Sequence, residues 1–280
     1  MIAESVTCGI DPDAFNAFEA GGWEQKAAGY DRFFGGITGR LVEPLLDAAR
    51  VGTGTRTLDL ASGPGYVAAA AAERGASVTG VDVAAAMVSF AGGLHPGIEF
   101  LQADVHQLPF ADASFDALVA NFLILHLGRP EVAAAEFARV LRDGGRLALT
   151  AWDLPGRARF LGVFLDAVAE AGARPPEDIP TGPDFFRFSV DGELDTLLRE
   201  QGLEDRVVTT ISFTHTVASA DDLWNGLLGG TVRTSALIQR QSEEVQQRIR
   251  AAFNRLVEPY RRGDALELPV SAKLAAGRRP

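Results

Sequence analysis

The sequence predicts an α/β protein built on an open, mostly parallel sheet. Between residues 56 and 152, short apolar runs alternate with alanine-rich stretches of helical spacing, which is typical of parallel strands joined by crossover helices. One run leads into a glycine-rich turn and then a helix, in TLDLASGPGY at residues 57–66. Two later runs end at Asp82 and Asp104, so each places a carboxylate after a strand. These patterns indicate a sheet whose carboxyl edge binds a ligand.

The five expected parallel strands have the usual length of about five or six residues. They span Thr57–Leu60, Ser77–Asp82, Ile98–Ala103, Phe115–Asn121 and Arg146–Trp152. The helices between them are expected at Tyr66–Arg74, Ala84–Ala91 and Glu131–Leu141. The last helix is followed by Asp143-Gly144-Gly145, where glycine adopts the left-handed conformation that ends many helices.

After Trp152 the alternation stops, and a different arrangement is predicted. A proline- and glycine-rich segment at residues 173–186 is expected to form a long loop. Helices are expected at Arg159–Ala171, Gly192–Gln201, Ala220–Leu228 and Ser235–Leu256, and strands at Val207–Thr214 and Leu266–Leu274. If these two strands pair antiparallel, the sheet has seven strands, and the helices form a lid above its carboxyl edge.

Three parts of one domain follow from this pattern. Residues 1–55 are expected to form an N-terminal helical cap, and residues 56–152 the core that binds a cofactor. Residues 153–280 are expected to supply lid helices and the closing antiparallel strands of the same domain.

The composition limits the classes of protein to which the chain can belong. Its 280 residues are 47% hydrophobic and 22% charged, as in ordinary globular domains. The 26 Lys and Arg against 37 Asp and Glu give a net charge of −11, which disfavours nucleic acid as a partner. The sequence has a single cysteine, Cys8, no signal-peptide pattern and no apolar run of about 18 residues. We therefore expect a cytoplasmic protein that has no disulfide and no membrane partner.

The glycine-rich turn is the most informative segment of the sequence. Gly63-x-Gly65-x-x-Ala68 fits the dinucleotide-binding fingerprint, and Asp82 lies 19 residues beyond Gly63. Asp59, however, stands just before the turn, where its charge repels a pyrophosphate and attracts the ammonium and sulfonium groups of S-adenosylmethionine. The carboxylate of Asp82 suits two ribose hydroxyls, and that of Asp104 the adenine amino group.

These motifs resemble those of the class I S-adenosylmethionine-dependent methyltransferases, in the small-molecule branch that includes ubiquinone and menaquinone biosynthesis enzymes. The resemblance covers about Tyr30 to Trp152 and rests on LDLASGPGY, GVDVAAAMV, QADVHQLPF, SFDALVANFLILHL and LRDGGRLALTAW. It implies a seven-stranded Rossmann-like methyltransferase sheet with helical lid insertions, and S-adenosyl-L-methionine as the cofactor.

The resemblance also implies a set of cofactor-binding residues. Asp59, Ala61, Gly63 and Gly65 would hold the methionine part, Asp82 the ribose, Val83 and Met87 the adenine faces, Asp104 and Val105 its polar edge, and Asn121 and Phe122 the floor near the sulfonium. Tyr30 would either contact the carboxylate of the cofactor or only pack. Ala61 stands where the family more often has glycine, and we expect it to have ordinary backbone angles.

Candidates for chemistry and for acceptor binding lie outside these motifs. His126 follows the fourth strand and is expected either to take a proton from the acceptor or to support the loop. His95, His106 and His215 have the spacing of unrelated surface or strand residues. The acceptor chamber is expected from Trp152, Phe186, Arg187, Trp224 and Arg233, which suit a flat, partly apolar molecule with an anionic group, although lid packing also explains them.

The predicted function is methyl transfer from S-adenosylmethionine to an oxygen, carbon or nitrogen atom of a small molecule. No metal is expected to take part, and the chain is expected to be a monomer or a homodimer. Two alternatives stay open: a methyltransferase-like protein that uses the bound cofactor structurally, as a cyclase or metabolite binder, and an NAD-dependent oxidoreductase.

Overall fold

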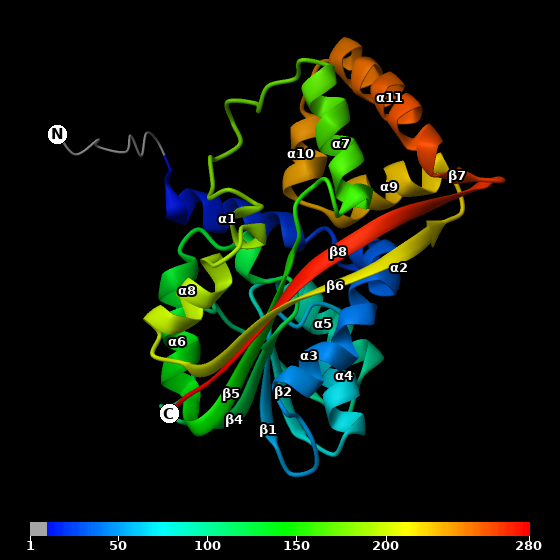
Figure 1. Ribbon diagram of the computed structural model, residues 1–280. Helices are drawn as coiled ribbons and strands as arrows, with labels where there is room; N and C mark the ends of the chain where they lie inside the picture. Colours follow the sequence, from blue (N-terminus) through cyan, green and yellow to red (C-terminus); the bar gives the residue numbers. More distant parts are fainter. Residues whose placement is uncertain (1–9) are drawn as a thin grey trace.

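An eight-stranded sheet forms the centre of the structure, a computed structural model that describes residues 10–280 (Figure 1). The expectation for Cys8 concerns a residue outside this range. The strands are β1 Arg56–Leu60, β2 Ser77–Asp82, β3 Glu99–Gln102, β4 Phe115–Ala120, β5 Leu141–Trp152, β6 Glu204–Val217, β7 Arg261–Arg262 and β8 Ala265–Arg278. Their order is β3-β2-β1-β4-β5-β8-β6, and β7 pairs with β8.

The pairing of these strands confirms the predicted sheet and adds one short strand to it. β1 to β5 run parallel, whereas β8 is antiparallel to both β5 and β6, as the two late apolar runs predicted. The unpredicted strand is β7, because two residues are too few to show a periodicity. β5 begins at Leu141, five residues before its predicted start, and Gly144 within it has a φ of +76°.

The α-helices cover the two faces and the carboxyl edge of this sheet. They are α1 Pro12–Trp23, α2 Ala27–Thr38, α3 Val42–Ala48, α4 Tyr66–Glu73, α5 Ala85–Leu94, α6 Pro130–Val140, α7 Arg159–Glu170, α8 Glu193–Glu200, α9 Ala220–Gly230, α10 Arg233–Gln239 and α11 Glu243–Val257. Short 3-10 helices are η1 Gly39–Leu41, η2 Ile124–His126, η3 Arg187–Ser189 and η4 Glu258–Tyr260. Figure 1 shows α3, α4 and α5 on one face, α6 and α8 on the other, and α7 with α9 to α11 beyond the carboxyl ends of the parallel strands.

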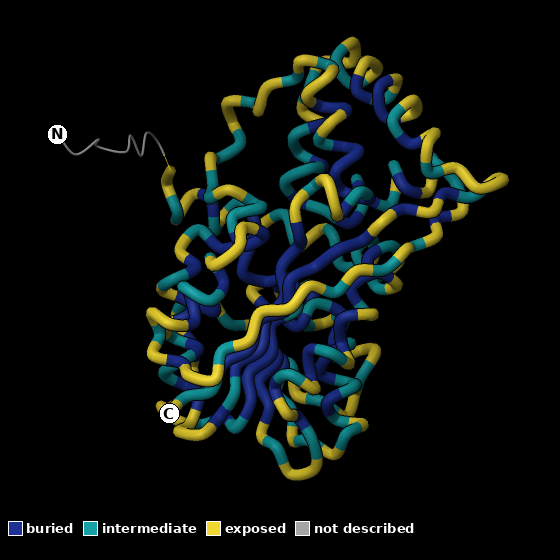
Figure 2. The backbone as a smooth tube through the Cα atoms, viewed as in Figure 1, coloured by how far each residue is buried: buried dark blue, intermediate teal, exposed yellow. Residues whose placement is uncertain are grey.

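The alternation of side chains along β4 explains the two layers of the core. Leu118 and Ala120 belong to the larger buried cluster with Phe137 of α6, whereas Ala117 and Val119 face the cluster formed with α3 and α4. Figure 2 shows the central strands buried and the edge strand β6 largely exposed. Among the helices of residues 10–280, none is both long enough and apolar enough to cross a bilayer.

The helix predicted at Ser235–Leu256 is wrong as a single element, because α10 and α11 are separate helices. Ser242 lies between them in an extended conformation, and its hydroxyl accepts the N–H of Val245 as the N-cap of α11. The side-chain amide of Gln246 donates to the carbonyls of Gln239 and Gln241 at the end of α10. The chain therefore turns at this point, which brings α10 over the carboxyl edge of the sheet.

Two helices that cap the carboxyl edge, α2 and α9, approach each other closely through glycines. A Cβ atom built on Gly29 would lie 2.3 Å from the carbonyl oxygen of Gly229. Because that oxygen belongs to the backbone, no change of side-chain rotamer can make room for the Cβ atom, and one of the two helices would have to move. The absence of a side chain at Gly29 is thus a requirement of the helix crossing.

We expect Gly29→Ala to lower the free energy of unfolding by about 1 to 3 kcal/mol, because it forces α2 away from α9. Gly21→Ala in α1 is the matched control, since nothing lies within 4 Å of its added Cβ. The control should gain about 0.5 to 1 kcal/mol, the ordinary benefit of alanine in a helix. Urea unfolding of both variants measures the difference, and equal stabilities would contradict the crossing argument.

Candidate functional site

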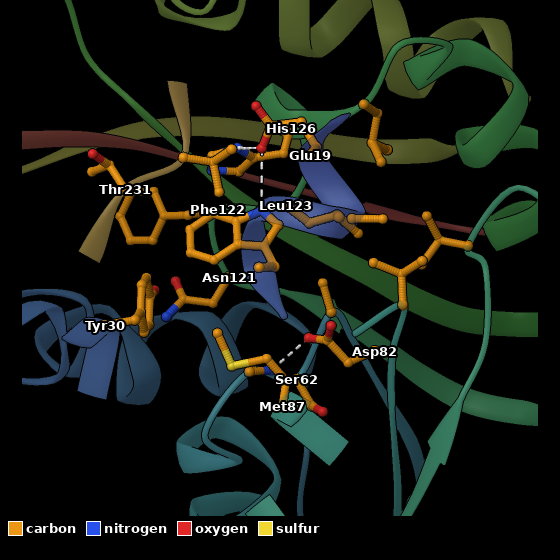
Figure 3. Close-up of a pocket in the computed structure, with 18 of the residues that line it drawn as sticks. Glu19, Tyr30, Ser62, Asp82, Met87, Asn121, Phe122, Leu123, His126 and Thr231 are labelled. Carbon is orange, nitrogen blue, oxygen red and sulfur yellow. Dashed lines mark hydrogen bonds and ion pairs between the residues drawn. The ribbon is translucent and has the colours of Figure 1, made fainter. Parts of the chain in front are cut away.

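A cavity of about 430 Å³ lies at the carboxyl ends of the parallel strands (Figure 3). Its floor comes from the segments that follow β1 to β4 and from the end of β5, and its roof from α1, α2 and residues 230–234. Of the predicted cofactor residues, the following line it: Tyr30, Asp59, Ala61, Gly63, Asp82, Val83, Met87, Asp104, Val105, Asn121 and Phe122. Gly65 does not; it precedes α4 with a φ of +84°, and a Cβ there would collide with Phe100 and His95.

Two of the carboxylates are held out of water by the turns that follow their strands. Asp59 is 1% exposed and accepts the N–H of Ala68 at 3.0 Å. Asp82 is 6% exposed and accepts the N–H groups of Gly63 and Ala84, each at 3.0 Å. Burial raises the pKa of Asp59 to about 8 and that of Asp82 to about 6. A cationic ligand in the cavity would offset this cost, because it favours both charged forms.

The third predicted acid, Asp104, occupies a more open position at the same edge. Its side chain is more than half exposed, and one oxygen lies 2.7 Å from Nδ1 of His106 and 2.9 Å from the N–H of that residue. His106 lines the cavity, so its interpretation as an unrelated surface residue was wrong. A ring placed two residues after Asp104 folds back onto the carboxylate through this short turn, which the spacing alone did not reveal.

Left-handed backbone occurs at two non-glycine positions of the cavity floor. Ala61 has a φ of +53°, so the expectation of ordinary angles for it was wrong. The φ of Phe122 is +61°, and its N–H donates at 2.9 Å to the hydroxyl of Thr150. That hydroxyl donates in turn to Asn121 Oδ1 at 2.7 Å. The ring of Phe122 stacks on Trp152 with centroids 3.7 Å apart, so this strained turn is fixed on both sides.

In the roof, Tyr30 is held among aromatic side chains. Its ring stacks on Phe34, with centroids 5.3 Å apart, and meets the edge of Trp23 at 5.7 Å. Burial raises the pKa of the phenol to about 12, so the hydroxyl stays protonated near neutral pH. Tyr30 can therefore donate a hydrogen bond to an anionic ligand group in the cavity.

At the end of the cavity opposite Asp82, His126 is paired with a carboxylate from the roof (Figure 3). Nδ1 of His126 lies 3.0 Å from Oε2 of Glu19, which also accepts the indole N–H of Trp23 at 3.1 Å. The side chain of Glu19 is only 4% exposed. This arrangement leaves Nε2 of His126 as the nitrogen available to a ligand. Sequence reasoning missed Glu19; the available signal was an acid four residues after Phe15 and four before Trp23 on one helical face.

The helix that carries Glu19 is attached to the core by further polar contacts. The carboxylate of Glu24, which follows α1, accepts the N–H groups of Ala85 and Ala86 at 2.7 and 2.9 Å. α5 has no side-chain cap of its own, so Glu24 satisfies its first free N–H groups. Near the other end of α1, Asn16 accepts the N–H of Gly128 at 2.7 Å.

The predicted acceptor residues separate into two groups. Trp152 and Arg233 line the cavity, as does Phe185, the neighbour of Phe186 in the same predicted aromatic cluster. Three others lie outside the lining: Phe186, Arg187 and Trp224. Phe186 instead packs edge to face on Phe185, with ring centroids 5.0 Å apart.

Charge pairing and packing explain where Arg187 and Trp224 lie. The guanidinium of Arg187 binds Glu131 at 2.6 Å and Glu193 at 2.8 Å, so it fastens η3 to α6 and α8. Trp224 stacks on Phe164, with ring centroids 5.5 Å apart, and the guanidinium of Arg250 lies 4.8 Å from its centroid. Both side chains therefore serve the packing of the helices around the sheet.

The comparisons with known proteins agree with this geometry. Residues 58–149 match the family model described as a methyltransferase domain. These residues form a class I S-adenosylmethionine-dependent methyltransferase domain. The resemblance found in the sequence motifs is thereby confirmed, and the matched range runs from β1 to β5 and contains the four strand ends that form the cavity floor.

Relatives and solved structures extend the likeness beyond the methyltransferase domain. Demethylmenaquinone methyltransferase of Beutenbergia cavernae is 35% identical over 139 residues, which are 47% of this chain and 58% of that protein. The chain thus spans about three fifths of the length of this curated relative. The YcgJ protein of Bacillus subtilis shares the fold, with a TM-score of 0.55 at 19% identity over 86% of this chain and 98% of that one.

A third likeness is to a methyltransferase solved with ligands. Phosphoethanolamine N-methyltransferase 2 of Haemonchus contortus, in complex with phosphomonomethylethanolamine and S-adenosylhomocysteine, has a TM-score of 0.58 at 17% identity. It covers 96% of this chain, and this chain covers 61% of it. At this identity the likeness shows the common methyltransferase fold.

The raised pKa of Asp59 predicts how stability depends on pH in the ligand-free protein. A carboxyl whose pKa is higher in the folded state contributes most below its unfolded pKa of about 4, and this contribution is lost as the pH rises to about 8. Asp59→Asn is neutral at every pH, so its free energy of unfolding should fall less over this range. The slope for each carboxyl is at most about 1.4 kcal/mol per pH unit. Urea unfolding from pH 4 to 9 tests this, and parallel curves for the two proteins would contradict it.

Proposed function

We propose that the protein transfers a methyl group from S-adenosylmethionine to an oxygen, carbon or nitrogen atom of a small-molecule acceptor. The observation that carries the proposal is a single cavity with acids at one end and a carboxylate-held histidine at the other. The acids suit a cationic nucleoside, and the histidine end is apolar enough to admit an organic acceptor. Such a cavity brings the donor and the acceptor together in one enclosed space.

The residues of the floor fit the proposed cofactor. Asp59 and Asp82 are buried carboxylates with no ion-pair partner in the described part of the chain, and the amino group and sulfonium of S-adenosylmethionine would supply positive charge beside them. Each oxygen of Asp82 accepts one backbone N–H and has a second lone pair for a ribose hydroxyl, and Met87 and Val83 would supply apolar contact for adenine. Gly63 and the unusual backbone of Ala61 let the main chain approach the methionine part, because no side chain projects from the glycine.

Bound S-adenosylmethionine supplies an electrophilic methyl group on a sulfonium. The contribution of the protein is first to hold both reactants in line, which in well-oriented systems is worth roughly 7 to 11 kcal/mol. His126 then takes the proton of an acidic acceptor at Nε2, while Glu19 holds Nδ1 and stabilises the imidazolium. The aromatic roof of Trp23 and Tyr30 keeps water from the methyl group.

Label transfer tests the proposed reaction directly. The protein is incubated with methyl-labelled S-adenosylmethionine and a fractionated metabolite extract, with demethylmenaquinol included because the relative is named for demethylmenaquinone. Appearance of labelled product together with S-adenosylhomocysteine supports methyl transfer. Tight cofactor binding with no labelled product in any fraction would favour a protein that uses the cofactor structurally, and binding of NAD alone would favour an oxidoreductase.

We expect Asp82→Ala to weaken S-adenosylhomocysteine binding by about 1 to 3 kcal/mol, because two charge-assisted hydrogen bonds to the ribose are lost. Isothermal titration calorimetry measures this change. Asp178→Ala is the control, since Asp178 pairs with Arg240 on the surface. Unchanged affinity in Asp82→Ala would contradict the ribose role.

His126→Gln should lower kcat by about 10²- to 10⁴-fold with the labelled acceptor, while its KM changes by less than about threefold. The glutamine retains a hydrogen-bonding side chain beside Glu19 but cannot take the proton. His215→Gln, on β6, is the matched control and should retain full activity. A loss smaller than about tenfold would show that His126 is not the base.

A further inference from the structure

Arg233, at the start of α10, is the one Arg or Lys among the described residues that line the cavity. Its guanidinium lies 4.8 Å from the ring centroid of Phe15 and 5.4 Å from that of Phe185. One nitrogen, Nη2, donates to the carbonyl of Pro183 at 2.9 Å. The group is thus held between two rings by the long loop, beside the apolar end of the cavity.

The polar contacts of Arg233 are incomplete. Nη1 is buried and has no hydrogen-bond partner among residues 10–280, and neither has Oε1 of Glu19, which lies 3.9 Å from Nε of Arg233. A buried N–H of a charged group without an acceptor is costly, so the arrangement gains stability when an anionic oxygen reaches it. The structure therefore contains an unused donor next to the proposed proton acceptor.

Glu19 and Phe185 place this donor close to His126. Glu19 binds His126 through Oε2 and approaches Arg233 through Oε1. The ring centroid of Phe185 lies 5.6 Å from that of His126, at a distance similar to that from Arg233. Because both groups share one carboxylate and one ring, a single small molecule can meet both with neighbouring substituents.

We propose that Arg233 determines acceptor specificity by binding an anionic oxygen of the substituent on the carbon next to the one that carries the methylated hydroxyl. The proposal rests on the proposed function and narrows its acceptor to flat molecules with adjacent hydroxyl and carboxylate or enolate oxygens. In the reaction, the acceptor oxygen forms a bond to the methyl carbon as the carbon–sulfur bond breaks, and its electron pair stays on sulfur. The hydroxyl proton passes to Nε2 of His126 and then to solvent, so the products are the methyl ether, S-adenosylhomocysteine and a proton.

Three matched probes test this subsite on the full chain saturated with S-adenosylhomocysteine. They are 3-hydroxy-2-naphthoate, which has both groups, 2-naphthol, which lacks the carboxylate, and 2-naphthoate, which lacks the hydroxyl. Calorimetry should show that 3-hydroxy-2-naphthoate binds at least about tenfold more tightly than 2-naphthol, with 2-naphthoate between them. Equal affinities, or no binding of 3-hydroxy-2-naphthoate, would overturn the proposal on the wild-type protein alone.

Variants of Arg233 distinguish a role in acceptor specificity from a role in packing alone. Arg233→Met should reduce the preference for the carboxylate to within about twofold while the affinity for S-adenosylhomocysteine is unchanged. Arg240 follows α10 and lies outside the cavity lining, where it pairs with Asp178 and lies over the ring of Phe18. Arg240→Met should therefore retain the preference. If Arg233→Met lowers the melting temperature but retains the preference, Arg233 is structural and the proposal is wrong. Arg233→Lys, which keeps the charge, should retain part of the preference and serves where the methionine variant does not fold.

Failure of this proposal is distinct from failure of the proposed function. A protein that binds S-adenosylhomocysteine and transfers label, but does not discriminate among the probes, refutes the role of Arg233 alone. A protein that binds no S-adenosylhomocysteine refutes both.

Discussion

The burial of two carboxyl groups at the ends of β1 and β2 is the constraint on which the rest of this structure depends. Removing a carboxylate from water costs several kcal/mol unless hydrogen bonds or opposite charge replace the lost hydration. Here the replacement comes from N–H groups of the segments that follow. Ala68, in the first turn of α4, donates to Asp59, and Gly63 and Ala84 donate to Asp82. The glycine-rich turn and the carboxylates therefore stabilise each other, and within residues 10–280 no cationic side chain pairs with either acid.

The opposite end of the cavity is organised by a different interaction, a carboxylate shared among side chains of the roof. Glu19 accepts from Trp23, holds His126 and approaches Arg233, so one buried acid fixes the orientation of groups from three segments. The cavity thus has a floor determined by backbone geometry and a roof determined by side-chain contacts. In the proposed function the floor binds the cofactor and the roof contacts the acceptor. This difference fits those roles, because one cofactor is common to many methyltransferases while acceptors differ.

The sequence predicted the floor well and the roof poorly, for a physical reason. Strand periodicity and the glycine turn are local, so β1 to β5 and the acids Asp59, Asp82 and Asp104 could be placed from short windows. The partner of His126 lies 107 residues away on a helix, and no local pattern connects them. The break between α10 and α11 depends on a serine N-cap inside an otherwise helical stretch. Arg187 lies outside the cavity because it forms ion pairs with two acids on other helices. Long-range pairing decided each of these positions.

Glu24 joins the end of α1, in the roof of the cavity, to the start of α5, beside the floor. Because α5 begins at Ala85 directly after the segment that carries Asp82, the same carboxylate that completes this helix also keeps α1 closed over the strand ends. Displacing α1 would break both hydrogen bonds and return two N–H groups at the start of α5 to water, so the position of α1 and the order of the first turn of α5 are coupled. The roof of the cavity and the helix behind Asp82 are thus joined directly, although Glu24 and Ala85 are 61 residues apart in the sequence.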